Sequence, residues 1–277
     1  VNLLLGVNGS GKTSFLNAIT VLYEGIVGNG LSGLFRQWGS YASIVNACGE
    51  DSPDCFSLSY VFDVTELKKL VLSPPFQYDV HYKITVFPLG NGSNYSLCET
   101  LYSQDNRSKK KSFSYLEFRG GIGQISVRSA DGKITDPQRY LPSFVVREAI
   151  SSIAVYGKFN FATVRQPSEA STNTKLMKSG ENLAHLLSNL NNKHSFHYEK
   201  IRDSLKDINP NFTDIGYNIF GSRLYLSLRE KNLAHAIDAL HISDGTLKYM
   251  LLMSIFYNPE RGLLLCIDEP EACLHPD

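Results

Sequence analysis

The sequence predicts an α/β fold in which strand–loop–helix units enclose an antiparallel β lobe and a helical lobe. Three observations lead to this prediction. A short apolar run at Val1–Leu5 meets a glycine-rich loop, and helical periodicity follows that loop. Period-two alternation with turn signals fills residues 55–137. Helical periodicity dominates residues 138–261, and residues 262–277 begin with a second apolar run that ends in two acids.

Residues 1–54 are expected to hold the first strand and the first helix. The run Val1–Leu5 is short, apolar and stopped by a glycine, which is typical of a buried parallel strand. A helix is expected from about Lys12 to Tyr23, with one face formed by Phe15, Leu16, Ile19 and Leu22. The chain opens without Met, so we expect it to be the interior of a longer protein.

Residues 55–137 are expected to form antiparallel β structure inserted after the first helix. Apolar and polar residues alternate through "CFSLSYVFDV", "YDVHYKITVF" and "ISVRS". Asn91-Gly92 and Asp131-Gly132 lie between such runs, and these dipeptides favour the tight turns of β-hairpins.

Residues 138–261 are expected to be mainly helical. The patterns indicate helices at Val145–Val155, Glu181–Asn191 and Phe196–Ile208, a strand at Phe159–Val164, and a hairpin at Phe212–Leu228 that turns near Gly221-Ser222. A further helix follows "ISDGTLKYM" and reaches about Tyr257. Its start at Ser243–Gly245 is typical of a helix cap, because Ser and Asp side chains satisfy N–H groups at a helix start.

Composition indicates a globular protein without a membrane span. The 277 residues are 43% hydrophobic and 19% charged, and 27 basic residues balance 27 acidic ones. Zero net charge gives no argument for nucleic-acid binding by the whole chain, so any such contact must be local. The basic run Arg107–Lys111 is typical of a solvated loop, with phosphate binding as the alternative. Five scattered cysteines indicate a reducing compartment and no structural zinc, and no signal peptide is visible, so we expect a cytoplasmic protein.

The loop Gly6-Val7-Asn8-Gly9-Ser10-Gly11-Lys12-Thr13 matches the phosphate-binding pattern G-x-x-x-x-G-K-[ST]. Glycines let such a loop wrap closely, so that backbone N–H groups converge on phosphate oxygens at the helix N-terminus. Lys12 is expected to reach the β- and γ-phosphates of ATP, and the Thr13 hydroxyl to bind Mg²⁺. The predicted nucleotide-binding set is Asn8, Gly9, Ser10, Gly11, Lys12, Thr13 and Ser14. These residues predict a P-loop NTPase.

The second apolar run, "LLLCI", leads directly to Asp268-Glu269. A buried strand that ends in two carboxylates is a Walker B arrangement. Asp268 is expected to hold Mg²⁺ through water, and Glu269 to polarise the attacking water as a general base. Acids that merely cap a following helix are the alternative. The complete P-loop favours the Walker B interpretation over helix capping. The two motifs together predict an ATPase that releases ADP and phosphate.

The three motifs "GVNGSGKTSFLNAI", "ISDGTLKYMLLM" and "IDEPEACLHPD" resemble, in this order, the ABC-type ATPase heads of the SMC/RecF/OLD group. The nearest likeness is to the AAA "predicted ATPase" branch found in overcoming-lysogenisation nucleases and in anti-phage systems such as Septu and retron-linked ATPases. "GENLAHLL" at Gly180–Leu187 is also similar to this branch. The resemblance implies one ABC-type head over residues 1–277, lacking its first β-hairpin and its switch histidine.

The resemblance also implies a homodimer that assembles head to tail around ATP. Ser243, Asp244 and Gly245 occupy the signature position, where one subunit's helix start meets the γ-phosphate bound by the other subunit. Asp244 departs from the glycine of transporter signatures, and its charge there requires a compensating cation, for which Lys248 is a candidate. Dimers or higher oligomers are the implied assembly.

Other site residues follow from the resemblance with alternatives open. Gln166 is a candidate for the catalytic Q-loop glutamine, and Gln37 competes with it. His275 falls in the D-loop, which contacts the partner subunit, although a plain loop histidine fits equally. Arg36 fits the basic residue after the first helix, or an ordinary surface arginine.

The function expected from these residues is an ATP-driven switch for an effector nuclease or a DNA-binding assembly, in defence or repair. A repair-type head that binds DNA directly, through patches such as Lys109–Lys111, is one alternative. A nucleotide-binding scaffold with little hydrolysis is another, and Glu269 beside Asp268 argues against it. No membrane partner is expected.

Overall fold

The computed structural model describes residues 4–7, 9–28, 30–39, 41–44, 54–71, 75–90, 94–105, 108–122, 140–169 and 172–274. Predictions outside these residues concern Val1–Leu3, Asn8, the turns Asn91-Gly92 and Asp131-Gly132, "ISVRS", and His275, and the side chains of Lys109–Lys111 are also not described. The chain divides into two compact units, Val1–Ile153 and Ala154–Asp277, and each is described on its own.

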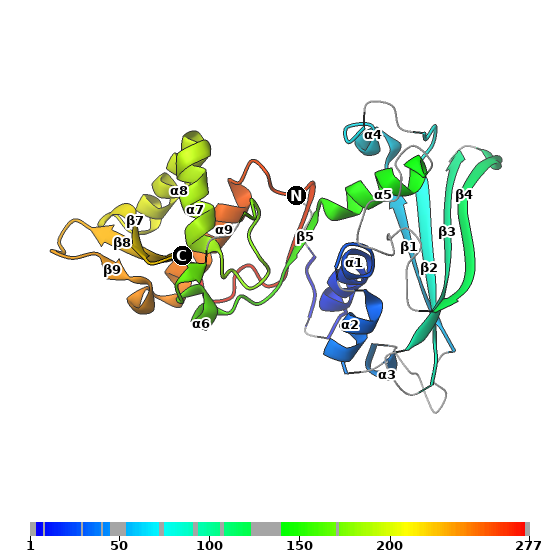
Figure 1. The fold of residues 1–277 in the computed structure, drawn as a ribbon, viewed down its shortest axis with the longest axis horizontal. Coiled ribbons are helices and arrows are strands. Elements are labelled where there is room, and N and C mark those ends of the chain that lie inside the picture. The colour runs from blue at the N-terminus through cyan, green and yellow to red at the C-terminus, as the bar shows by residue number, and fades with distance from the viewer. Residues whose placement is uncertain are drawn as a thin grey trace. The chain divides into compact units, whose positions relative to one another are not determined.

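The first unit is built on a four-stranded sheet in the order β1-β2-β3-β4 (Figure 1). Its strands are β1 (Phe56–Phe62), β2 (Val80–Pro88), β3 (Tyr95–Asp105) and β4 (Ser108–Ile122). All three neighbouring pairs are antiparallel, and the register places Tyr60, Tyr82 and Leu101 side by side. Burial alternates along β2 and β3, so one face of the sheet is buried and mainly apolar. The predicted antiparallel β structure is confirmed.

Five helices accompany this sheet within the described residues: α1 (Lys12–Ile26), α2 (Leu31–Gln37), α3 (Tyr41–Ile44), α4 (Val64–Leu67) and α5 (Leu141–Ser151). The Tyr60 hydroxyl of β1 donates to the Ala18 carbonyl of α1 at 2.8 Å. The Phe35 ring of α2 meets the Tyr95 ring of β3 edge-on, with centroids 5.5 Å apart. These contacts hold α1 and α2 on the apolar face of the sheet.

Two predictions for the N-terminal segment are wrong in part, at Leu4–Leu5 and at Phe15. Leu4 and Leu5 lie outside any strand and are exposed, Leu5 by 82%, since no described strand pairs with them. The predicted helix is confirmed as α1, but Phe15 is 56% exposed. The buried residues of α1 all lie in its second half, beginning at Val21.

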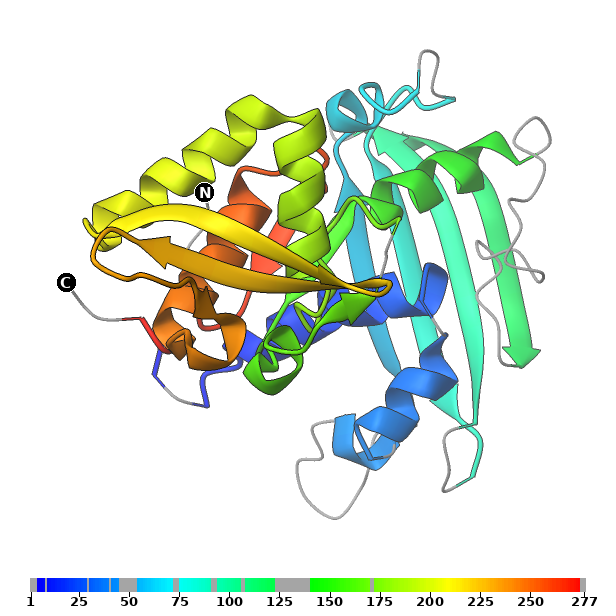
Figure 2. The ribbon, with the colours of Figure 1, turned by 60° about the vertical axis from the view of Figure 1, so that its left-hand side comes forward.

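The second unit packs helices against a small sheet around one core. Its helices are α6 (Phe161–Val164), α7 (Leu183–Lys193), α8 (Ser195–Ile208), the 3₁₀ turn η1 (Ala239–His241) and α9 (Asp244–Phe256). Its strands are β5 (Ile153–Tyr156), β6 (Ser168–Glu169), β7 (Phe212–Phe220), β8 (Arg223–Glu230), β9 (Ile237–Asp238) and β10 (Leu264–Ile267). The β7–β8 hairpin packs on α7 and α8, and α9 packs against both helices (Figure 2). The predicted hairpin and the helices α7, α8 and α9 are confirmed.

The segment around residue 160 differs from its prediction. The predicted strand Phe159–Val164 contains the short helix α6, because the Asn160 side chain accepts a hydrogen bond from the Thr163 N–H and caps it. The predicted helix Val145–Val155 ends at Ser151, and Ile153–Tyr156 is instead the strand β5, which pairs with β10. A short apolar run of this kind fits either type of element.

The "GENLAHLL" segment has a structural explanation. Gly180 has a φ of +80°, and a Cβ there would lie 2.9 Å from side-chain atoms of both Leu251 and Val164. The buried Asn182 side chain accepts from the Met177 N–H at 2.8 Å and donates to the Lys175 carbonyl at 3.0 Å. Gly180 therefore permits a close approach to α9, and Asn182 closes the loop before α7.

We predict that Asn182→Ala lowers the free energy of unfolding by about 1–3 kcal/mol, because it leaves the part-buried Met177 N–H and Lys175 carbonyl without the side-chain amide. Asn191→Ala is the matched control, since Asn191 is exposed on α7. Urea denaturation followed by circular dichroism at 222 nm measures both variants. Equal midpoints for the two variants would contradict the assigned role.

Candidate functional site

The glycine-rich loop and the start of α1 form the first part of the candidate site. Gly9 and Gly11 have φ of +82° and +88°, left-handed values that only glycine adopts readily. A Cβ at either residue would meet nothing within 4 Å. Gly11 caps α1, whose first turn contains no acidic residue. Gly9 and Gly11 are therefore explained by their backbone conformation and not by close packing. The loop borders open space at a helix N-terminus, as an anion site requires.

Lys12 lies over this loop. Its ammonium donates to the Gly6 carbonyl at 2.6 Å and to the Val7 carbonyl at 3.0 Å. The Ser10 N–H also donates to Val7, at 3.2 Å, and narrows the loop. Thr13 and Ser14 follow, exposed, on the first turn of α1. A phosphate would compete with two carbonyls for the Lys12 ammonium, and a charged oxygen is the stronger acceptor. The loop therefore has the backbone conformation and the cation that a phosphate group requires.

The acids follow β10, at the other end of the sequence. The Asp268 N–H donates to the Tyr156 carbonyl at 2.9 Å, which continues the pairing of β10 with β5. The chain then turns sharply through Asp268–Leu274, called here the acid turn. Glu269 and Cys273 adopt left-handed φ of 46° and 68° although neither is glycine. Such a residue costs roughly 1–2 kcal/mol, so the surrounding contacts must hold it.

Two backbone hydrogen bonds close the acid turn on itself. The Ala272 N–H donates to the Glu269 carbonyl at 3.1 Å, and the Leu274 N–H donates to the Glu271 carbonyl at 3.0 Å. The Glu269 side chain is exposed, whereas Asp268 is half-buried. An exposed carboxylate can reach a water molecule, as a general base requires.

The start of α9 packs directly on the acid turn. Ser243 is its N-cap, and the Ser243 hydroxyl accepts from the Thr246 N–H at 3.1 Å, so the predicted cap is confirmed. A Cβ on Gly245 would lie 2.9 Å from the Cys273 carbonyl oxygen, closer than real Cβ atoms come. The structure thus brings Ser243–Gly245 together with Asp268–Cys273.

Asp244 has a different cation from the one expected. Arg165, in the turn after α6, forms an ion pair with Asp244 and donates to the Ile242 carbonyl at 2.8 Å. The expectation that Lys248 compensates Asp244 is therefore wrong, because Lys248 points to the acid turn. Sequence reasoning missed Arg165, which lies 79 residues from Asp244.

Lys248 is almost completely buried, with 3% of its surface exposed. Its ammonium donates to the Glu269 carbonyl at 3.4 Å and lies 5.1 Å from the centroid of the Phe159 ring. Burial lowers the pKa of the Lys248 ammonium, and the acidic groups of the acid turn, with Cys273 first, oppose that change. The Lys248 side chain therefore links α9 to the backbone of Glu269.

The glutamine candidates lie in different units. Gln166 is exposed, immediately after Arg165, and so lies near the start of α9. Gln37 is exposed at the end of α2, and Arg36 beside it donates to the Ser32 carbonyl at 3.3 Å. The choice between the glutamines stays open. The P-loop belongs to Val1–Ile153 and the acids to Ala154–Asp277, so their union in one site stays a prediction.

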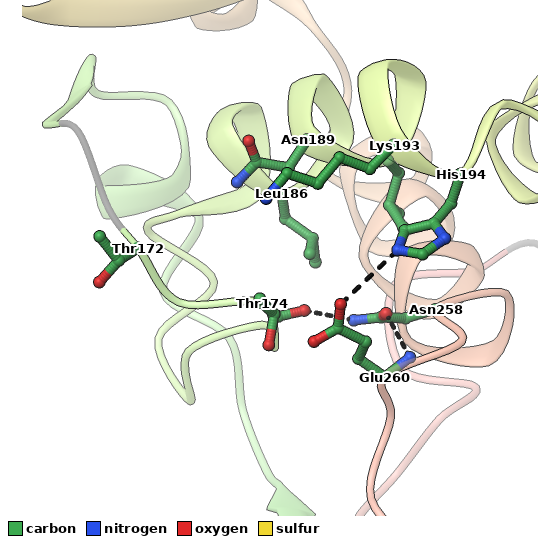
Figure 3. Close-up of a pocket in the computed structure, with 9 residues that line it drawn as sticks. Thr172, Thr174, Leu186, Asn189, Lys193, His194, Asn258 and Glu260 are labelled. Carbon is green, nitrogen blue, oxygen red and sulfur yellow. Dashed lines mark hydrogen bonds and ion pairs between the residues drawn. The ribbon is translucent and has the colours of Figure 1, made fainter.

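A separate cavity of about 250 Å³ lies in the second unit (Figure 3). The His194 Nε2 lies 3.6 Å from a Glu260 carboxylate oxygen, and the Asn258 amide donates to the Thr174 carbonyl at 2.7 Å. Hydrogen bonding by the Thr174 side chain, and then His194, holds the pKa of Glu260 below its usual range. These groups contact each other, and their contacts join the end of α7 to the turn after α9. The sequence analysis did not single it out.

The model of one protein family matches residues 102–277 of this chain, which is more than half of its length. That family is described as "AAA domain, putative AbiEii toxin, Type IV TA system". The chain belongs to this AAA family. The matched part of the AAA domain includes Gln166, α9 and the acid turn, and it begins after the P-loop. No curated protein sequence matches the chain.

Membership of this family confirms the general predictions about the fold and the nucleotide. The AAA domain is a P-loop ATPase of mixed α/β structure with an antiparallel sheet, and ATP with Mg²⁺ is the usual ligand of such domains. Among the helices that the structure describes, none combines the length and apolar character needed to span a bilayer.

We predict that Arg165→Met lowers the free energy of unfolding by about 1–2 kcal/mol, since it removes the partners of both Asp244 and the Ile242 carbonyl. Asp244→Asn should cost less than about 1 kcal/mol, because Arg165 keeps its bond to Ile242 and Asp244 is half-exposed. Urea denaturation of both variants tests this order. A larger loss for Asp244→Asn would contradict it.

Proposed function

We propose that this AAA domain is an ABC-type head of the SMC/RecF/OLD kind, which binds and hydrolyses ATP in the cytoplasm. On this proposal two copies assemble head to tail around ATP and switch an effector nuclease or a DNA-binding assembly in anti-phage defence. The observation that carries the proposal is the start of α9, which is exposed, capped and packed on the acid turn of the same chain. The description of the family as a putative toxin of a toxin–antitoxin system is compatible with a defence role.

The charge at the start of α9 supports an incoming phosphate. Asp244 alone would repel the γ-phosphate, but Arg165 neutralises it and leaves the positive end of the helix dipole. Ser243 is exposed at the same place. An anion carried by a second copy could therefore approach this helix without opposing net charge.

Each residue has a defined part in the proposed hydrolysis. The P-loop backbone and Lys12 bind the phosphates and hold the charge that develops on them. Glu269 takes a proton from the attacking water, and Gln166 is the candidate for orienting that water. Mg²⁺, held by Thr13 and Asp268, would neutralise charge on the β- and γ-phosphates.

We predict that Glu269→Gln reduces the rate of phosphate release by about 100-fold or more, because the amide cannot accept the proton from water. Lys12→Ala should lose a similar factor through weaker phosphate binding. Glu199→Gln, an exposed carboxylate change on α8, serves as the control and should leave the rate unchanged. A wild-type rate equal to that of Lys12→Ala would favour a nucleotide-binding scaffold instead.

We predict that Glu269→Gln accumulates as a dimer with ATP, since the nucleotide that joins the two copies is no longer consumed. Size-exclusion chromatography with light scattering measures the mass with and without ATP. Adding Ser243→Arg should abolish the dimer and leave ATP binding intact, because a bulky side chain then blocks the start of α9. A monomer at every ATP concentration would refute the head-to-tail assembly.

A further inference from the structure

We infer that Lys248 is a positioning residue for the general base: from the signature helix α9, its ammonium holds the backbone of Glu269 in the conformation that hydrolysis needs. The inference rests on the proposed function, because it assigns Lys248 to the same ATP site. Lys248 itself touches no phosphate in this scheme and acts only through Glu269.

The contacts around Lys248 point to the backbone of the acid turn. The ammonium donates to the Glu269 carbonyl at 3.4 Å, and the Ala272 N–H donates to the same oxygen at 3.1 Å. Two donors from different elements thus converge on one carbonyl. Lys248 is buried and its ammonium also lies over the Phe159 ring, so the ammonium has little freedom to turn toward solvent.

The conformation of Glu269 explains why such a contact is needed. Its left-handed φ of 46° is unfavourable for a residue with a Cβ and persists only where neighbouring contacts hold it. At 3.4 Å the contact is longer than a typical charge-assisted hydrogen bond, but the ammonium charge still attracts the Glu269 carbonyl dipole. The orientation of the Glu269 carboxylate follows from its backbone, and a misplacement of 1 Å can slow a reaction about 100-fold.

A second contact on the same helix supports this role. Gly245, one turn before Lys248, lies so close to the Cys273 carbonyl that no side chain fits. The first two turns of α9 therefore contact the acid turn at both of its left-handed residues, Glu269 and Cys273. In the proposed dimer the same helix start meets the other copy's γ-phosphate. Lys248 would then transmit the arrival of that phosphate to the general base of its own subunit.

The experiment compares Lys248→Met, which keeps the side-chain length but removes the donor, with Lys248→Arg, which keeps a donor. Lys200→Met is the matched control, because the exposed Lys200 ammonium of α8 also lies over a phenylalanine ring, 5.4 Å from the centroid of Phe196. Hydrogen–deuterium exchange of the nucleotide-free protein reports the Ala272 and Leu274 amides. Steady-state phosphate release reports kcat and KM for ATP.

We predict that Lys248→Met speeds exchange at both amides by about fivefold, the factor that corresponds to one lost hydrogen bond. It should lower kcat about tenfold or more and leave KM within about twofold, because binding by the P-loop does not change. Lys248→Arg should recover most of kcat, and Lys200→Met should match the wild type. The melting temperature of Lys248→Met should not fall, since replacing a buried cation by an apolar side chain is often neutral or stabilising.

Unchanged exchange at Ala272 and Leu274 would overturn the inference, and so would a kcat within twofold of the wild type when exchange is faster. A fall in kcat that comes with a lower melting temperature and without recovery in Lys248→Arg would also overturn it, since that pattern reflects general destabilisation. Wild-type hydrolysis no faster than Lys12→Ala would refute the proposed function instead. In that case the exchange measurement still decides whether Lys248 holds the acid turn.

Discussion

The burial of α9 is the constraint on which the Ala154–Asp277 unit depends. Its buried residues are Leu247, Lys248, Met250, Leu251, Leu252, Ser254 and Ile255, which recur around most of the helix. A helix buried on several sides must satisfy its polar groups within the protein. The Ser254 hydroxyl donates to the Leu251 carbonyl at 2.7 Å, and Lys248 donates to Glu269. Because the core fixes α9, it also fixes the acid turn that α9 contacts.

The charges at the start of α9 follow from the same packing. Ile242 is buried immediately before the cap, and its carbonyl is satisfied by Arg165. The Arg165 guanidinium then pairs with Asp244, so one side chain completes the backbone and neutralises the carboxylate. As a result the Asp244 carboxylate at the helix start is paired, and the segment that carries Gln166 is joined to the start of α9. The Arg165 guanidinium thus contacts both the backbone before α9 and the first carboxylate of α9.

The sequence predicted elements with strong periodicity or clear turn signals, and it failed where the signal was short or distant. The helices α1, α7, α8 and α9 and the β7–β8 hairpin follow from patterns of ten or more residues. The run Phe159–Val164 is too short for periodicity to decide, and the capping side chain of Asn160 decides it instead. The prediction that Lys248 compensates Asp244 was wrong. A single sequence carries no information on the contact between Arg165 and Asp244, which lie far apart along the chain. The P-loop and the acid pair were predicted from local motifs, because the residue types that their chemistry needs are adjacent in the sequence.

The two parts of the candidate site use left-handed backbone in opposite ways. In the P-loop, Gly9 and Gly11 adopt it without strain beside open space, so the loop can exchange hydrogen bonds when a phosphate arrives. In the acid turn, Glu269 and Cys273 adopt it against their preference and are held by α9. Nucleotide binding would therefore rearrange Lys12 and its two carbonyl partners at little cost, whereas a shift of the Glu269 backbone would break its contact with Lys248 of α9. On the proposed function, a phosphate that docks on the start of α9 would act on an element that contacts the backbone of Glu269, and assembly of the dimer would then have a physical route to the rate of hydrolysis.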